Sequence, residues 1–478
     1  MKKAMIKIAA PAVTFLFFYA SNAKAQNDFN LESMNASDIE FSGELNQKGI
    51  FDWIKPGNSD SDEKVEKEWT IMVFMNAKND LSDSSLLGLV GKWAVKDIKE
   101  MKKVGTTDKV NIIVEHGAAG KGSKRMLIKK KSSIFSSGEK VYGEYPNADM
   151  GDYKRVVEFV KWSKKEFPAK KYMLVLWNHG LGWLDPNMET MSAGTGATDK
   201  GILFDDETKN YVRTKELGEM MKQAGYVDAL VLNACLMQMA EVAYEVKDYT
   251  GIIVGSEETM LAQGFNYEKL LNFMNSNTKA SNTELSSFFT NWYKEFFANG
   301  LSIGPIDIPM DEIGGTLSII DSQAMNTLPS YLSAFAKAAM DNNEEEAVKY
   351  AIQNVIRFTS IDPSDKEKML ASYADLYDFV RLTAEKAQSQ ATIQAATDLQ
   401  TFISSSLIVG NVGINGDTNN DYDYTKVGGI AIETTRKIKK DISSQLSGLF
   451  ETPYNTLSLS KDSQWDEFVS WSNEVWAK

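Results

Sequence analysis

Six short apolar segments recur along this chain and constrain its fold more than any other feature. They span residues 70–75, 109–115, 172–177, 228–232, 251–255 and 316–320. Segments with helical periodicity, such as 86–103 and 153–166, separate most of them. Alternating strands and helices are typical of a parallel sheet, because a parallel pair of strands needs a long crossover that a helix usually supplies. The sequence therefore predicts an α/β fold with a mainly parallel sheet flanked by helices.

Two of these segments lead to side chains that can do chemistry. Segment 172–177 is followed by His179, one of two histidines, and segment 228–232 by Cys235, the only cysteine of 478 residues. A lone thiol forms no disulfide within its own chain, so Cys235 is either an inert buried residue or a nucleophile. Neighbouring parallel strands bring their C-terminal ends to one sheet edge, where α/β folds build sites. An imidazole there can take the proton of a thiol, whose usual pKa of about 8.5 leaves it mostly protonated at neutral pH.

The same residues resemble the clostripain family of cysteine peptidases, which shares a clan with caspases and gingipains. The likeness is carried by HG at 179–180, NACLM at 233–237, WTIMVFMNAKNDL at 69–81, ADMGD at 148–152, GSEETMLAQGFNY at 255–267, LYDF at 376–379 and Trp465. It implies a caspase-like fold in which His179 and Cys235 are the catalytic pair of an endopeptidase that cuts a protein or peptide substrate. The backbone N–H groups of Gly180 and Cys235 are then the expected oxyanion donors, since amide donors need no particular side chain.

The chain divides into four expected parts. They are a signal peptide (1–25), a polar linker or propeptide (26–66), a caspase-like catalytic domain (67–325) and a C-terminal helical and mixed subdomain (326–478). The leader is indicated by lysines before the apolar run 8–20 and by Ala23-Lys24-Ala25, which places small residues where a signal peptidase reads. The run is too short for a membrane anchor. The protein is therefore expected in the periplasm or outside the cell.

Charge and composition narrow the partners. The leader holds four of the 52 basic residues and no acidic ones, so its removal leaves 48 basic against 65 acidic residues and a net charge of −17. Such a surface argues against nucleic acid as a partner. The acidic run from Asp417 to Asp423 alternates like the start of a calcium loop, but Tyr422 stands where the loop glycine belongs and Gly428 where the glutamate belongs. No cofactor is assigned, and a calcium site elsewhere stays open because some relatives use calcium.

The segment 184–214, between the histidine and the cysteine, contains MSAGTGATDKG at 191–201. Small and polar residues of this kind are typical of an exposed loop, where chains are readily nicked. One interpretation is a flexible surface loop without further role. The resemblance offers another, because members of the family often mature by cutting themselves after a basic residue in this region. Lys200–Gly201 is the best-placed bond.

The residues expected around the bound substrate depart from the family pattern. Relatives that cut after Arg or Lys commonly carry an acid two positions before the cysteine and another near 263–265. This chain has Asn233 and Gln263 there, which keep the shape of an acidic side chain and lose its charge. Glu257 or the adjacent Glu258 could restore a carboxylate. The sequence therefore leaves two preferences open for the residue that is cut, P1: basic or neutral polar.

Two alternatives to this interpretation remain. His116 also follows an apolar segment and precedes a glycine, so on local grounds it could be the base, although it lies one strand earlier than the family's histidine. The chain could also be a secreted, non-catalytic binding protein that keeps the caspase-like fold. That possibility rests on Asn178, Asn233 and Gln263, which all replace acids of the family pattern.

Overall fold

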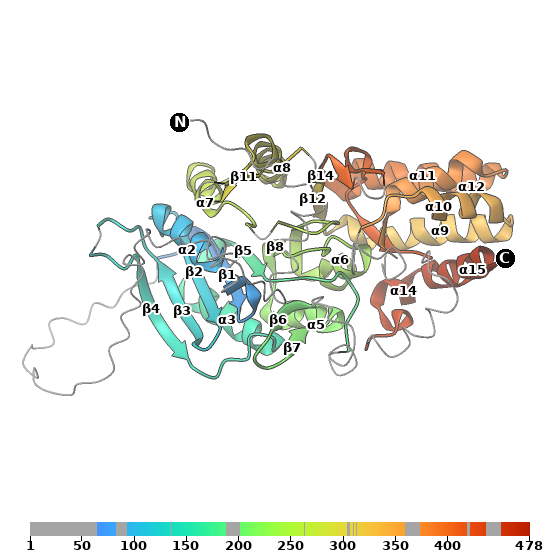
Figure 1. The fold of residues 1–478 in the computed structure, drawn as a ribbon. Helices are drawn as coiled ribbons and strands as arrows, with labels where there is room; N and C mark the ends of the chain where they lie inside the picture. Colours follow the sequence, from blue (N-terminus) through green and yellow to red (C-terminus); the bar gives the residue numbers. More distant parts are fainter. Residues whose placement is uncertain are drawn as a thin grey trace, which may run out of the picture.

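A nine-stranded sheet forms the centre of the computed structural model (Figure 1), which describes residues 65–82, 93–187, 201–358, 373–435 and 451–478 apart from 134, 262, 304, 305, 309, 312 and 418–420. The strand order is β14-β12-β9-β8-β5-β1-β2-β3-β4. The five middle strands, β9 to β2, are parallel, whereas the two outer strands on each side are antiparallel to their neighbours. The sheet strands are β1 Lys67–Ala77, β2 Val110–Ala118, β3 Gly122–Ile128, β4 Glu139–Tyr145, β5 Ala169–Trp177, β8 Val227–Asn233, β9 Thr250–Gly255, β12 Gly315–Asp321 and β14 Ile408–Ile414.

Shorter strands pair outside this sheet. They are β6 Ile202–Asp205 with β7 Asn210–Val212, β10 Leu301–Ile303 with β11 Ile306–Ile308, β13 Tyr373–Asp375 with β17 Ala431–Glu433, and β15 Gly416–Asp417 with β16 Tyr422–Asp423. The helices are α2 Trp93–Val104, α3 Tyr153–Glu166, α5 Thr214–Ala224, α6 Ala240–Val246, α7 Tyr267–Ser276, α8 Asn282–Asn299, α9 Leu328–Asp341, α10 Glu345–Asn354, α11 Leu376–Lys386, α12 Gln390–Phe402, α14 Ser458–Asp462 and α15 Trp465–Ala477. A short 3₁₀ turn, η1 Asp80–Ser82, follows β1.

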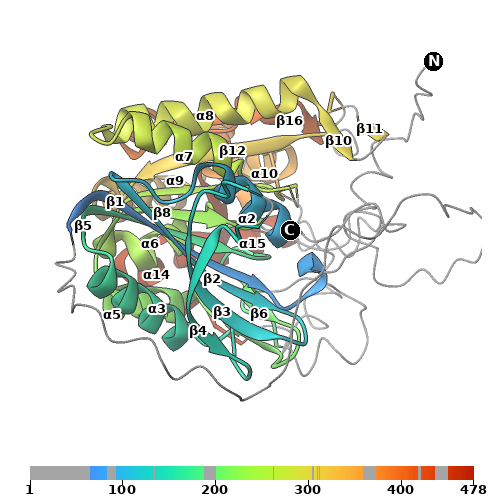
Figure 2. The ribbon, with the colours of Figure 1, turned by 90° about the vertical axis from the view of Figure 1, so that its left-hand side faces the viewer.

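The middle strands are continuous apolar runs because helices cover both faces of the sheet. In β1, Met72 and Phe74 point into the core beneath α3 and α5, whereas Ile71 and Val73 point into the core beneath α2, α7 and α8. Figure 2 shows these two helical layers above and below the strands. The helix α3 begins where the Asp152 carboxylate accepts the Lys154 N–H at 2.9 Å, an N-cap contact.

The C-terminal half packs against the end of the sheet opposite β4 (Figure 1). Trp465 is fully buried there, with its ring against Phe335 and Phe468, and its indole N–H donates to the carbonyl of Glu433 at 2.7 Å. The strand β14 returns from this half to the sheet and pairs with β12. The two halves therefore share one sheet and one continuous core on the α3 side.

Each of the six apolar segments forms a strand of the sheet, and the helical pattern at 153–166 matches α3. The helix α11 begins at Leu376, directly after β13, and the Asp375 carboxylate caps it by accepting the Asp378 N–H. The late apolar residues 431–433 form β17, which pairs with β13. The predicted leader and most of the polar segment 26–66 lie outside the described residues. The boundary proposed at 325/326 stays a prediction.

Within the described ranges, no helix is long and apolar enough to span a bilayer.

Candidate active site

The register between β5 and β8 sets the candidate pair at one edge of the sheet. Trp177 lies opposite Asn233 in the parallel ladder, and both His179 and Cys235 follow two residues later. The turns after the strands touch, because a Cβ atom added to Gly180 would lie 2.4 Å from the carbonyl oxygen of Cys235. The structure thus brings His179, Gly180 and Cys235 together on adjacent strand ends.

Cys235 sits at a tight turn that a second segment supports. Its side chain is partly exposed, and the backbone N–H of Met260 points at the sulfur with a distance of 3.2 Å. Leu236 has φ +61°, a left-handed conformation that is uncommon for a residue other than glycine. The Leu236 N–H donates to the carbonyl of Glu258 at 3.2 Å and holds the turn against residues 256–260. Backbone strain of this kind persists only where the surroundings fix it, as at functional sites.

The imidazole of His179 contacts a carboxylate that sequence reasoning did not single out. Its Nε2 atom lies 2.9 Å from Oδ1 of Asp80, in η1 after β1. Asn178, next in sequence, points away from the site, since its amide donates to the carbonyl of Asn76 at 2.6 Å. Asp80 belongs to the NAKNDL motif, and β1 is the other neighbour of β5. Asp80 could have been predicted as a partner of His179 only from the strand order, which places β1 beside β5.

His116 does not lie with Cys235. It is in β2, which is separated from β5 by β1, opposite Lys124 of β3. Burial, with the nearby Lys124 ammonium as the next cause, lowers the pKa of His116 to about 4. The ring is therefore neutral at ordinary pH, but it is too far along the sheet to serve the thiol.

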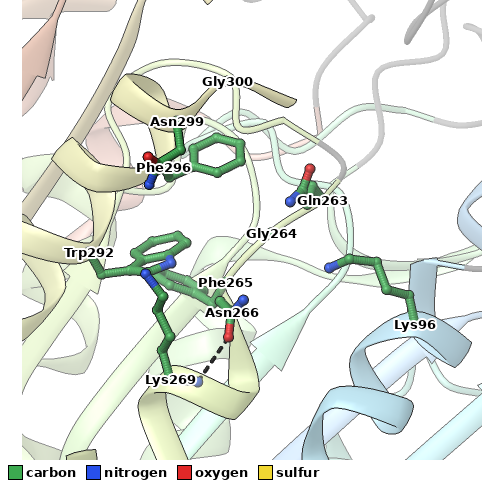
Figure 3. Close-up of a pocket in the computed structure, with 10 residues that line it drawn as sticks. All are labelled: Lys96, Gln263, Gly264, Phe265, Asn266, Lys269, Trp292, Phe296, Asn299 and Gly300. Atoms are coloured by element: carbon green, nitrogen blue, oxygen red, sulfur yellow. Dashed lines mark hydrogen bonds between the residues drawn. The ribbon is translucent and has the colours of Figure 1, made fainter. Parts of the chain in front are cut away.

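Asn233 contacts the loop to which Gln263 belongs. Asn233 is buried, donates to the hydroxyl of Tyr267 at 3.2 Å, and packs on Gly264, where an added Cβ would come within 2.9 Å of the amide. Gln263 lines a cavity of about 130 Å³ (Figure 3). The cavity is lined by Lys96, Gln263, Gly264, Phe265, Asn266, Lys269, Trp292, Phe296, Asn299 and Gly300. These liners include two ammonium groups and no carboxylate.

Glu257 is buried and turned toward the C-terminal half. Neither of its oxygens receives a hydrogen bond from an N–H or hydroxyl group of the described residues, and its partner is the carboxyl of Asp375. Burial and the nearby Asp375 charge raise the pKa of Glu257 well above its usual range. Burial likewise raises the pKa of Glu258 to about 7, and its carboxylate accepts the Tyr424 hydroxyl at 2.5 Å. Both acids are thus engaged within the protein interior.

The flanks of the candidate cleavage segment are held together. Lys200 itself lies outside the described residues, whereas Gly201 is buried against the ring of Tyr211. The Tyr211 hydroxyl donates to the carbonyl of Pro186 at 2.8 Å. Farther along, the Asp185 carboxylate accepts the Thr214 N–H at 3.0 Å. The described residues on the two sides of the segment 188–200 are therefore joined through Tyr211.

Within the described residues, no group of three or more His, Cys, Asp or Glu side chains is arranged to hold a metal ion. Asp423, from the calcium-like run, instead accepts the N–H of Thr425 as a local cap. Asn419 of that run lies outside the described part of the chain.

Comparisons with known proteins agree with this architecture. Clostripain from Hathewaya histolytica is 25% identical over 277 residues, which cover 50% of this chain and only 48% of that protein. A secreted C11 cysteine protease from Bacteroides thetaiotaomicron, solved with an irreversible peptide inhibitor, superposes with a TM-score of 0.58 at 18% identity, over 85% of this chain and 99% of its own. An inactive zymogen C11 protease from Parabacteroides distasonis gives 0.57 at 18%, over 83% and 98%.

These likenesses confirm the predicted fold class, a caspase-like α/β sheet flanked by helices. The sequence model of the clostripain family matches residues 73–471, which is most of the chain. The chain therefore belongs to the clostripain family of cysteine proteases.

Proposed function

We propose that this protein is an exported cysteine endopeptidase in which Cys235 is the nucleophile and His179 the general base. The observation that carries the proposal is the β5–β8 register, which puts both side chains two residues beyond one paired position. His179 takes the thiol proton as sulfur bonds to the scissile carbonyl, then gives it to the leaving amine. Water releases the acyl group from the sulfur. The N–H groups of Gly180 and Cys235 are the proposed donors to the oxyanion.

The contacts around the loop at 263–264 favour a neutral polar P1 residue over a basic one. Asn233 and Gln263 carry amides at the two positions where the family pattern has acids that would attract an ammonium or guanidinium group. Glu257 and Glu258 are engaged with Asp375 and Tyr424. A pocket without a carboxylate cannot form the ion pair that would favour a basic P1 residue, and removing one partner of a buried ion pair typically costs about 2 to 5 kcal/mol.

Self-processing at Lys200–Gly201 is proposed as a slow step of maturation, since a pocket that favours neutral P1 residues accepts the basic Lys200 only weakly. Such a cut leaves β1 to β5 on one fragment and β8, β9, β12 and β14 on the other, all within one sheet. Because β5 and β8 are direct neighbours, the two fragments stay joined by the ladder that positions His179 and Cys235. We therefore expect cleavage to leave the positions of His179 and Cys235 unchanged.

The reactivity of Cys235 tests the pair directly. We expect iodoacetamide to alkylate wild type at least about tenfold faster than His179→Ala, since the thiolate is the reactive form and the imidazole supplies it. His116→Gln is the control and should leave the rate unchanged. Cys235→Ala should fold normally and cleave no peptide in a mixed library. A slow thiol that does not respond to His179→Ala, in a protein that cuts nothing, would instead favour the non-catalytic binding protein.

Asn233→Asp tests the pocket. The change adds one charge at almost constant volume, so kcat/KM should rise at least about tenfold on Arg and Lys peptides and stay level on neutral ones. Fluorogenic peptides that differ only at P1 provide the measurement. Asn354→Asp, an equivalent change at an exposed and distant position, is the control. Equal changes on both peptides would show that Asn233 does not select P1.

Self-processing should follow the same preference. Intact mass over time should show wild type cut slowly between Lys200 and Gly201, with the fragments associated, and Asn233→Asp cut faster. The double variant Asn233→Asp/Cys235→Ala should remain one chain. Equal splitting in the double variant would assign the cut to another protease.

A further inference from the structure

Three consecutive strands of the sheet end in three polar side chains that form a line. The order β8, β5, β1 places Cys235, His179 and Asp80 beside one another at the same edge. His179 thus has the thiol strand on one side and a carboxylate on the other, with Nε2 at 2.9 Å from Asp80 Oδ1. A histidine between a nucleophile and a carboxylate is the arrangement in which the carboxylate orients the ring.

The contact also decides which ring nitrogen does the chemistry. A neutral imidazole carries one N–H, and a carboxylate can only accept, so the nitrogen facing Asp80 is the one that holds the hydrogen. Nδ1 is then the nitrogen without a proton. We propose that Asp80 is a positioning residue that fixes the His179 ring through Nε2–H, so that Nδ1 takes the Cys235 proton. This inference rests on the proposed peptidase function.

The loop that carries Asp80 is anchored by three buried side-chain amides. Asn76, Asn79 and Asn178 all donate to the carbonyl oxygen of Phe204, at 3.1, 3.2 and 3.2 Å. Asn76 and Asn79 flank the turn into Asp80, and Asn178 precedes His179. The segments that carry Asp80 and His179 are therefore bonded to the same carbonyl oxygen, that of Phe204. This shared acceptor restrains the distance between the carboxylate and the imidazole although neither side chain is buried.

The anchoring amides matter because the contact itself is weak. The side chains of Asp80 and His179 are 41% and 24% exposed, and exposed pairs contribute only about 0 to 1 kcal/mol to stability. Removal of the Asp80 carboxylate should therefore leave the fold intact. The loss should instead slow the chemical step, because the orientation of the His179 ring affects the rate more than the weak Asp80–His179 attraction affects stability.

Asp80→Ala is the first variant of the test. We expect kcat on a peptide substrate to fall about 30- to 100-fold, at the low end of what general-base catalysis supplies, with KM within about twofold and an unchanged melting temperature. Asp80→Asn keeps an oxygen that can accept the Nε2–H bond and should recover at least about a third of the lost rate on a logarithmic scale. Asp341→Ala removes another exposed carboxylate, paired with Lys337 at 2.6 Å, and should change nothing.

Two kinetic outcomes would overturn the proposal. One is a kcat for Asp80→Ala within about threefold of wild type. The other is an equal loss in Asp80→Ala and Asp80→Asn accompanied by a lower melting temperature, which would make Asp80 a structural residue.

A spectroscopic measurement separates this inference from the function on which it rests. The chain has two histidines, so protein labelled with ¹⁵N-histidine gives signals from two rings, which His116→Gln assigns. Asp80→Ala should shift the Nε2 resonance of His179 and leave His116 unchanged. Unshifted His179 resonances would refute the contact even in a protein without activity. A shift in a protein that cuts no peptide would refute the proposed function and leave the contact in place.

Discussion

The pairing of Trp177 with Asn233 is the contact on which the rest of the site depends. A parallel ladder keeps corresponding residues level, so the two strands end together and their next side chains emerge at one edge. A slip of one residue would turn every side chain of β8 to the opposite face of the sheet. The apolar residues on both faces of these strands make such a slip costly, since each face is buried in its own core. The core thus specifies the position of the thiol relative to the imidazole.

The C-terminal half supports the turn that carries Cys235, the proposed nucleophile, through residues 256–260. Residues 256–260 hold the turn at Cys235 by two hydrogen bonds. The Leu236 N–H donates to the Glu258 carbonyl, and the Met260 N–H donates to the Cys235 sulfur. The acids of that segment are held in turn by Asp375 and Tyr424, which come from the second half of the chain. These contacts support the proposal that the same acids do not bind a basic P1 residue. They also connect the C-terminal half to the turn that carries Cys235.

The sequence predicted what depends on local pattern. Continuous apolar runs located the middle strands, and the residues just beyond two of them, His179 and Cys235, were candidates because few other groups in the chain can do this chemistry. Asp80 could not be predicted from the sequence, because its proposed role depends on β1 being the neighbour of β5, and no local pattern reveals the strand order. The environment of Glu257 was equally hidden, because its partner Asp375 is far away in sequence. The hairpin of β3 and β4 at one end of the sheet was not predicted, because its strands alternate only weakly between buried and exposed residues.

Trapping of the acyl-enzyme tests the central claim most directly, because only a covalent intermediate on one sulfur distinguishes this mechanism from other hydrolysis. Wild type is mixed with an activated ester of a peptide that it cuts, quenched in acid within the first turnover, and mapped by mass spectrometry. Our account predicts one adduct, on Cys235, that forms and decays in wild type and forms more slowly in His179→Ala. Cleavage without any adduct, or an adduct on another residue, would contradict it.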